Sequence, residues 1–546
     1  EAVAFVCAAI ATYIPAHRTA EPTPPTEQPP TIPLGCVSRS ADPDTYLTGD
    51  VVTKLAVAQA AGPRYSPQAV ALADVQPHPI PHTDISVGLG AEWVPAEYYR
   101  TWLYHLFAGL DWGLSVERSP SGVWLVVSTN PAIATLDSHV RTPRVDALDL
   151  ISAAMNNQMP LVTDTPSTSG RPIRNEAATM EAQARVQELR QKFDSWVWTD
   201  EQRTAHLAEI YNARFNRFVS RSARPPRPLT TQIAHVVSGY AYRIKPHQLR
   251  GVTRIIEGGT YDRSAYLVYP PGYGKTDPAV IATEELRAAG QQGRTVIAVP
   301  ASVVGQWLAR YRKLYPKASH LLAYSGRTAA ERREFWRTAQ TAQVLIISHE
   351  MLREVPLSLP SYAALVSEEL TELRQTLRDA EYGATAAAKE STKLARRALR
   401  ARDTALRGEL EAHALYCEGR PAWESLSVDH LIIDEAHFAK SLGVVTRMER
   451  VAGLPRGESA RALDCWAKCQ TVLRAGGRVT ALSGTPLTNS LAEAHIWMRM
   501  LQPGLLARVG LSRFDDWASV FAEAHPSVEM DCVGRFRAQT RLRFRN

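Results

Sequence analysis

The stretch Tyr266-Leu-Val-Tyr-Pro-Pro-Gly-Tyr-Gly-Lys-Thr276 decides the fold of this chain. Its first four residues are typical of a buried strand, and residues 277–289 after it have a composition compatible with a helix. A glycine-rich turn between a strand and a helix presents backbone N–H groups that bind phosphate. The stretch therefore predicts a phosphate-binding loop in a parallel α/β sheet.

The polar residues of this loop have separate expected roles. Gly272 and Gly274, with Tyr273 between them, let the backbone close round the phosphates. Lys275 is expected to place a positive charge on the β- and γ-phosphates of ATP, and the Thr276 hydroxyl is expected to ligate Mg²⁺. The alternative is a turn with a chance lysine, which the flanking strand and helix disfavour.

A second apolar run, residues 431–433, leads into the acidic sequence Asp434-Glu-Ala-His437. Because the carboxyl ends of parallel strands meet at one edge of a sheet, these acids can reach a nucleotide on a neighbouring loop. We expect Asp434 to hold Mg²⁺, and Glu435 to orient and deprotonate the attacking water. An acidic pair after a strand is also a common helix N-cap, but Lys275 in the same chain favours a catalytic role.

Short apolar runs alternate with helical stretches from residue 243 onward, at residues 266–269, 295–299, 344–347, 430–433 and 478–482. This alternation is typical of a parallel α/β sheet, and five strands are thereby placed.

One exception interrupts the alternation. Residues 365–413 are rich in Ala, Glu, Arg and Leu, which predicts an antiparallel helical hairpin inserted in the lobe at about 356–420. Its helix contacts are assigned to Leu370, Leu373, Leu377, Leu394, Ala398, Ala401 and Ala405. A solvated charged hairpin and an arm that contacts nucleic acid or protein are both left open.

Composition and pattern divide the whole chain into a tail with a Pro-rich linker (1–33), a small mixed α/β domain (34–170), a helical segment (171–240), an α/β lobe (241–515) and the start of a connector to a second lobe (516–546). Neither end carries a start or stop signal, so the chain is expected to be part of a longer protein.

The 62 basic and 55 acidic residues give a formal charge of +7, which is compatible with a polyanionic partner without demonstrating one. The six cysteines include no C-x-x-C pair, which argues against a disulfide framework or a zinc site and favours a reducing cytoplasm. Cys465 and Cys469, one helical turn apart, are expected to pack in the interior. The apolar segment formed by residues 2–14 is too short to span a bilayer, so we expect no membrane partner.

Asp434-Glu-Ala-His437 resembles the Asp-Glu-x-His (DEAH) box of Swi/Snf-type ATPases in helicase superfamily two. The other motifs of that family have counterparts in the same order, at 245–250 for the adenine-reading segment, at the phosphate loop, and at 298–308, 347–352 and 482–490 for motifs Ia, Ic and III. The resemblance implies a RecA-like lobe that uses ATP and Mg²⁺, with Gln248 at the adenine edge.

The resemblance also implies how the lobe would act on DNA. Nucleotide state would pass from Glu435 and His437 to motif III, whose coupling residues are Ser483, Gly484 and Thr485. The residues expected to lie at the nucleic-acid contacts are Ser302, Gln306, Ser348 and His349. Contacts mainly to phosphates would make binding salt-sensitive and tolerant of sequence. Relatives of this type usually move on duplex DNA without separating its strands.

Trp196-Val-Trp198, the helical insertion and residues 451–455 resemble, more closely still, the helicase region of large phage and mobile-element proteins. A bacterial or phage-infected cell is thereby implied, and an adenine methylase region is often fused upstream in such proteins. No Asn-Pro-Pro-Tyr-type motif occurs in this chain, so methylase activity is not carried over. The family needs a second RecA-like lobe with arginine fingers, so this chain alone is expected to bind nucleotide and hydrolyse it poorly.

Two other functions are left open. An RNA or single-strand helicase of the same superfamily would carry the same motifs, and the nucleic acid that best stimulates the ATPase would distinguish it. A non-catalytic DNA-binding scaffold is the other alternative. Intact Lys275, Thr276, Asp434 and Glu435 argue against the scaffold, because a decayed site is free to lose its acids.

Overall fold

The computed structural model describes most of the chain beyond residue 45. The described residues are 46–109, 113–130, 133, 140–164, 173–219, 228–234, 236–237, 240–259, 261–291, 293–324, 328–382, 393–417, 420–448, 451–452, 454, 459–487, 492–530 and 536–545. The expected tail with its Pro-rich linker lies outside them.

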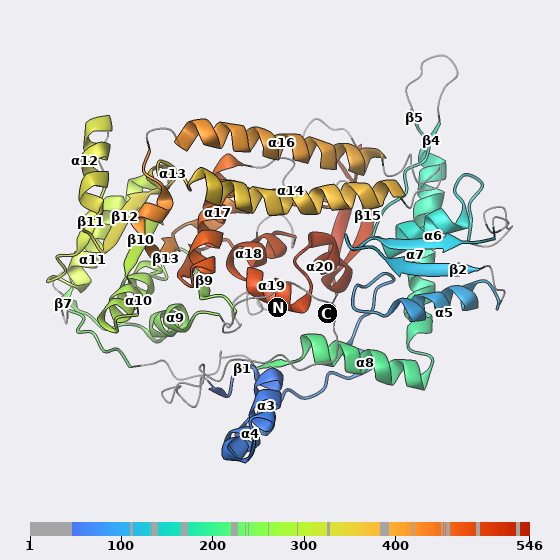
Figure 1. Cartoon of the computed structure of the whole chain (residues 1–546), viewed down its shortest axis with the longest axis horizontal. Helices are drawn as coiled ribbons and strands as arrows, with labels where there is room; N and C mark the ends of the chain where they lie inside the picture. The colour runs from blue at the N-terminus through green and yellow to red at the C-terminus, as the bar shows by residue number, and fades with distance from the viewer. Residues whose placement is uncertain are drawn as a thin grey trace.

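An all-parallel sheet forms the centre of the lobe (Figure 1). Its strands are β9 (Ser264–Val268), β10 (Arg294–Val299), β11 (Leu321–Ala323), β12 (Val344–Ser348), β13 (Val428–Ile433) and β14 (Arg478–Ser483). They lie in the order β11-β12-β10-β13-β14-β9. The predicted RecA-like α/β fold is confirmed, with all five predicted strands. β11 escaped prediction, because three half-buried residues at a sheet edge are too few for a periodic pattern.

Helices cover both faces of this sheet, because alternate side chains of each buried strand point to opposite faces. The helices on one face are α9 (Pro246–Glu257), α10 (Thr276–Ala288) and α11 (Val304–Leu314). They pack against strand residues such as Ile297 and Ile432. α17 (Ala460–Arg474) and α18 (Glu493–Leu501) pack with the alternate residues Ala298 and Ile433. Cys465 and Cys469 of α17 are buried, which confirms that they pack in the interior.

The register of the sheet places the carboxyl ends of four strands at one edge. Ile433 lies opposite Ala298 of β10 and Ala481 of β14, and Ser483 lies opposite the last residue of β9. The N–H of Asp434 extends the ladder with a 2.8 Å hydrogen bond to the Ala298 carbonyl. The segments that follow β9, β13 and β14 therefore meet at the edge where parallel sheets bind ligands.

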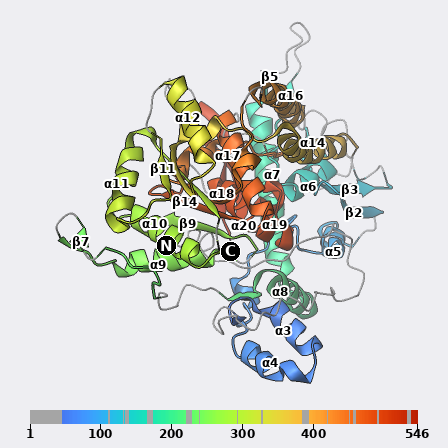
Figure 2. The same cartoon turned by 60° about the vertical axis from the view of Figure 1, so that its left-hand side comes forward.

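The inserted hairpin consists of α14 (Leu359–Tyr382) and α16 (Lys393–Cys417), which lie side by side across the lobe (Figures 1 and 2). The carbonyl oxygen of Leu357, just before α14, lies 2.9 Å from Nε2 of His413 and 3.3 Å from Sγ of Cys417. Because the start of α14 meets the end of α16, the hairpin is antiparallel, as predicted.

Leu370 and Leu373, assigned to the helix contact, are buried as predicted, and the side chains of Leu377, Leu394 and Ala398 lie outside the described part of the structure. The rest of that prediction is wrong. Ala401 and Ala405, assigned to the helix contact, are exposed, and Leu406 is fully buried in their place. Leu410 is also partly buried against the core. The helical period allows either face to turn inward, and the leucines remove more apolar area from water than the alanines would.

The region before the lobe has a core of aromatic side chains. Its main elements are α5 (Ala96–Leu106), β2 (Leu114–Arg118), β3 (Trp124–Ser128), α6 (Ala147–Met155), α7 (Glu176–Val197) and α8 (Glu201–Phe215). The ring centroid of Tyr99 lies 4.9 Å from that of Trp124 and 5.4 Å from that of Phe193. α7 therefore shares one core with α5 and the β2-β3 hairpin. Within the predicted helical segment, the structure has the two helices α7 and α8.

The other described α-helices and strands before residue 510 are β1 (Gly49–Asp50), α3 (Val51–Ala60), α4 (Ser66–Ala73), β4 (Thr163–Asp164), β5 (Ile173–Arg174), β6 (Phe218–Val219), β7 (Val236–Val237), β8 (Tyr240–Ala241), α12 (Ala329–Ala339), α13 (His349–Arg353) and α19 (Pro503–Val509). None of the described helices is both long and apolar enough to cross a membrane.

The last described elements are α20 (Phe514–Phe521) and the antiparallel strands β15 (Ala522–Met530) and β16 (Phe536–Phe544). The strands lie against α7, where the Ala524 carbonyl accepts hydrogen bonds from Arg190 Nη1 at 2.8 Å and from Gln187 Nε2 at 3.0 Å. These contacts tie the end of the described chain to the region before the lobe. The role of residues 516–546 as a connector stays a prediction.

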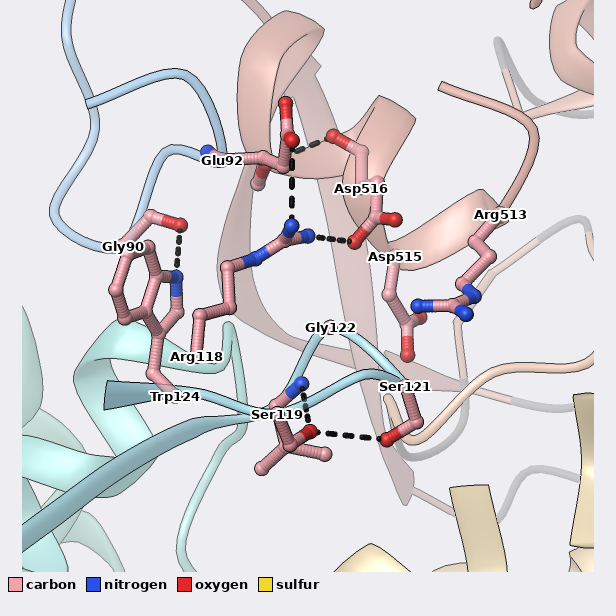
Figure 3. A network of polar contacts seen from close by, with 12 residues as sticks. Gly90, Glu92, Arg118, Ser119, Ser121, Gly122, Trp124, Arg513, Asp515 and Asp516 are labelled. Atoms are coloured by element: carbon pink, nitrogen blue, oxygen red, sulfur yellow. Dashed lines mark hydrogen bonds and ion pairs between the residues drawn. The ribbon is translucent and has the colours of Figure 1, made fainter. Parts of the chain in front are cut away.

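A network of opposite charges joins the same two regions (Figure 3). Arg118, at the end of β2, donates to Glu92 Oε1 at 3.2 Å and to Oδ1 of Asp516 in α20 at 2.6 Å. Arg214 of α8 lies 2.5 Å from the second oxygen of Glu92. Burial raises the pKa of Asp516 to about 6, although Arg118 opposes the shift. The junction is therefore built from charges that are matched across it.

Candidate functional site

The phosphate loop closes between β9 and α10 through two glycines in left-handed conformations. The backbone angle φ is 84° at Gly272 and 77° at Gly274, values that residues with side chains rarely adopt. A Cβ on Gly274 would also lie 2.6 Å from Nε2 of Gln248. The loop leads directly into α10, which begins at Thr276, and a helix N-terminus favours anions. The predicted strand-loop-helix context is present.

The fold brings Lys275 and Glu435 into contact across 160 residues of sequence, with Nζ 2.7 Å from Oε1. Glu435 has a left-handed backbone, with φ of 49°, a costly conformation that clusters at functional sites. Nδ1 of His437 lies 3.3 Å from the other oxygen of Glu435. The Lys275 side chain is 12% exposed and the Glu435 side chain 38%, so a ligand can approach the pair from the glutamate side.

Asp434 lies deeper at the same edge. Its Oδ1 accepts the N–H of Glu435 at 3.0 Å, and its Oδ2 accepts Nε1 of Trp307 at 3.1 Å. Burial and the neighbouring charge of Glu435 raise the pKa of Asp434, and Lys275 opposes them. A bound cation would stabilise such a carboxylate. The oxygens of Asp434 and Thr276 are the hard ligands that Mg²⁺ prefers, with phosphates and water completing its shell, so these residues fit the ion.

Gln248, on the first turn of α9, is buried and bonded at both ends of its amide. Its Oε1 accepts the N–H of Lys245 at 3.0 Å, and its Nε2 donates to the Gly274 carbonyl at 3.3 Å. Beside it, the ring centroid of His247 lies 5.6 Å from that of Tyr273, whose side chain is largely exposed. The structure thus places Gln248 against the phosphate loop and an aromatic pair at the surface next to it.

Asp277, which follows the loop directly, was not singled out from the sequence. Its two oxygens accept hydrogen bonds from Nε and Nη2 of Arg310, each at 2.6 Å. The hydroxyl of Tyr242 donates to it at 2.8 Å, and Nε2 of Gln248 lies 3.4 Å away. An acid two residues after Lys275 could have signalled a role, but the partners of Asp277 lie in other elements.

The predicted coupling residues lie between the phosphate loop and the acidic sequence. The buried Ser483 ends β14, where its carbonyl accepts the N–H of Tyr269 at 3.2 Å and its Oγ accepts the N–H of Thr485 at 3.1 Å. A Cβ on Gly484 would lie 3.2 Å from Cδ of Pro271, so this segment touches the start of the loop. Thr485 is exposed.

The predicted nucleic-acid residues divide into two pairs. Ser302 and Gln306, at the N-terminal end of α11, are exposed. Ser348 and His349 are buried: Oγ of Ser348 caps α13 by accepting the N–H of Met351, and Nε2 of His349 lies 2.9 Å from the Asp434 carbonyl. Burial lowers the pKa of His349. The first pair can meet a ligand in solution, and the second pair supports the acidic sequence.

Comparison with known proteins gives two family matches. The family described as "Probable helicase domain" matches residues 256–546, and a "Domain of unknown function (DUF8437)" matches residues 88–217. No curated protein matches. Among solved structures, the chain is similar to the Sulfolobus solfataricus SWI2/SNF2 ATPase core in complex with dsDNA, at 13% identity and a TM-score of 0.28. That similarity covers 55% of this chain and 41% of the other.

Proposed function

This chain belongs to the family described as "Probable helicase domain", and from that premise we propose that residues 241–515 form the first RecA-like ATPase lobe of a DNA translocase. The observation that carries the proposal is the pairing of Lys275 with Glu435. A cation beside the phosphate loop and an acid able to activate water lie 2.7 Å apart there. That juxtaposition suits the hydrolysis of a nucleoside triphosphate.

Mg-ATP is proposed to bind with its phosphates over residues 272–276, where backbone N–H groups and Lys275 offset their charge. Thr276 and Asp434 would hold Mg²⁺, which when bound supplies further positive charge to the phosphates. Glu435 orients a water toward the γ-phosphate and holds its proton on a carboxylate oxygen. His437, 3.3 Å from that carboxylate, fixes its direction.

The nucleic acid is proposed to be duplex DNA, bound through its phosphates. Exposed Ser302 and Gln306 would contact the backbone of one strand, in agreement with a formal charge of +7 on the chain. Ser348 and His349 would act from behind this surface, through the contact of His349 with the Asp434 carbonyl. Motif III, residues 483–485, would relay the state of the phosphate loop.

Full activity is proposed to need a second RecA-like lobe that supplies arginines to the γ-phosphate. Residues 1–546 by themselves are proposed to bind nucleotide and to turn it over slowly, without stimulation by duplex DNA. An upstream methylase region, and the cytoplasm of a bacterial or phage-infected cell, are proposals that rest on the family resemblance.

Calorimetry with Mg-ADP tests the nucleotide site. Lys275→Ala is expected to weaken binding by at least ~10-fold, because a hydrogen bond to a charged group contributes about 1.5–3 kcal/mol. Lys317→Ala, which removes an exposed lysine far along the chain from the loop, is the matched control and is expected to bind as the wild type does. If the Lys275→Ala variant bound Mg-ADP as tightly as the wild type does, residues 272–276 would not be the phosphate-binding site.

A further inference from the structure

α11 contacts the proposed ATP site at two points. Nε1 of the buried Trp307 donates to Oδ2 of Asp434 at 3.1 Å. Three residues later, Nε and Nη2 of Arg310 donate to the two oxygens of Asp277, each at 2.6 Å. Residues three apart on a helix are neighbours on its surface. One face of α11 is therefore bonded both to the acidic sequence after β13 and to the first turn of the helix after the phosphate loop.

Both contacts are stiff. Asp277 is 4% exposed and Asp434 7%, so neither carboxylate can exchange its partner freely for water. A two-pronged pairing of arginine with a carboxylate fixes the distance and the direction of approach. The hydroxyl of Tyr242 holds Asp277 from a further side, at 2.8 Å. A shift of α10 relative to β13 is therefore passed to α11 rather than absorbed by these side chains.

The exposed pair assigned to nucleic acid lies at the start of the same short helix. Gln306 precedes Trp307 directly, and Ser302 lies in the turn that leads into the helix. α11 spans 11 residues, and the buried Tyr311 and Leu314 anchor its far end in the core. Val304, at the start of the helix, packs in the same core, so a displacement of the contacts at its middle also reaches the N-terminal end that carries Gln306.

We propose that Trp307 and Arg310 are positioning residues that couple the nucleotide site to the nucleic-acid surface at the start of α11. The identity of the two ligands rests on the proposed function. Each ligand biases the position of the same helix, so each changes the affinity for the other by the same factor, as linkage requires.

The test measures that factor on the whole 546-residue chain. Affinity for a fluorescent DNA duplex is measured at fixed salt with and without saturating Mg-ADP, and affinity for Mg-ADP with and without the duplex. In the wild type the two ratios are expected to agree and to differ from one by ~5-fold or more. Both Trp307→Phe, which removes one N–H donor, and the double variant Asp277→Asn with Arg310→Gln, which leaves no buried charge unpaired, are expected to bring the ratio to one.

Arg312→Gln is the matched control, because Arg312 is an exposed residue of the same helix, and it is expected to keep the wild-type ratio. Retention of the wild-type ratio in the folded variants would overturn the coupling role, as would a wild-type ratio of one when both ligands bind. If Trp307→Phe does not fold, the double variant carries the test. Failure of the wild type to bind Mg-ADP or DNA at all counts against the proposed function, and the inference falls with it.

A spectroscopic readout separates coupling from simple support of the fold. In protein labelled with 5-fluorotryptophan, the resonance absent from the Trp307→Phe variant belongs to Trp307. This resonance is expected to shift when Mg-ADP is added alone and again when DNA is added alone. A resonance that responds to neither ligand would show that α11 does not follow the site.

Discussion

At the sheet edge Lys275 faces Glu435, and at the junction before the lobe Arg118 faces Glu92 and Asp516. The closest distances between charged atoms are nearly equal, 2.7 Å in the first cluster and 2.6 Å in the second. Their surroundings differ, because the side chain of Glu435 is 38% exposed and that of Asp516 only 9%. Arg118 also bridges acids that lie more than 400 residues apart in the sequence, at positions 92 and 516.

This difference in exposure distinguishes two kinds of charged group: those that can exchange partners with a ligand, and those that hold two regions of the chain together. A half-exposed carboxylate keeps part of its hydration and can turn toward a bound ligand at small cost. A buried carboxylate matched by a guanidinium has lost that hydration, so removal of its partner leaves an uncompensated charge. Substitutions at the sheet edge are therefore expected to change chemistry and spare stability, and substitutions at the junction to do the reverse.

The largest expected effect is on catalysis. In a chain that carries both lobes, Glu435→Gln is expected to keep ATP binding and to lower turnover by at least ~100-fold, because the amide cannot take a proton from water. Steady-state ATPase assays and calorimetry measure the two quantities. Glu334→Gln, at an exposed acid paired with Arg337, is the control and leaves both unchanged. Unchanged turnover in the Glu435→Gln variant would show that another residue acts as the general base.

The next effect concerns folding. Arg118→Met keeps the apolar stem of the side chain but removes the guanidinium that pairs with the buried Asp516. We therefore expect the free energy of unfolding at pH 8 to fall by about 3 kcal/mol, the low end for breaking a buried ion pair. Urea denaturation measures this loss, and the affinity for Mg-ADP is expected to stay the same. Arg337→Met, in an exposed pair, is the control and leaves stability unchanged. Equal stability of both variants would show that the junction does not depend on its charges.

The smallest effect is a pH dependence at the same junction. Burial raises the pKa of Asp516 to about 6 in the folded protein, whereas an unfolded aspartate has a pKa of about 3.9. The folded state binds this proton more tightly, so the contribution of Asp516 is fully present below about pH 4 and is lost as the pH rises through about 6.

Asp516→Asn removes this titration. The stability of the wild type relative to the variant is therefore expected to fall by on the order of 2 kcal/mol between pH 4 and pH 7. Urea titrations of both proteins across that range provide the measurement. A difference that is constant with pH would mean that Asp516 keeps its charge in the folded protein throughout.

Local patterns were enough to predict five of the six described strands of the central sheet and the glycine-rich loop between β9 and α10. Each buried strand is a short apolar run, and the residues expected to bind phosphate, Gly272 to Thr276, are consecutive in the sequence. The motifs also predicted that Asp434 and Glu435 lie near the loop, because the carboxyl ends of parallel strands share an edge. Glu435 contacts Lys275 there.

Contacts between distant segments could not be predicted in this way. Arg310 pairs with Asp277, which is 33 residues away in the sequence, and Arg118 pairs with Asp516, which is 398 residues away. With 62 basic and 55 acidic residues in the chain, many other pairs were open to each of them. The positions of charged residues follow no period from which their ion-pair partners could be predicted. The prediction of which face of α16 is buried was wrong for a related reason. Ala401 and Leu406 both fit a helical repeat, and only the packing of the folded chain determines which of them is buried.

The antiparallel hairpin enters and leaves the lobe at one place, since the carbonyl of Leu357 lies 3.3 Å from the sulfur of Cys417. An insert whose ends meet adds little closure cost to its host and leaves the flanking strands β12 and β13 where they are. The hairpin is not a detachable appendage, however, because Leu370 and Leu406 are buried in the same core as the sheet. A foreign module that replaces it must therefore have ends that meet at this place and apolar side chains that cover the same surface.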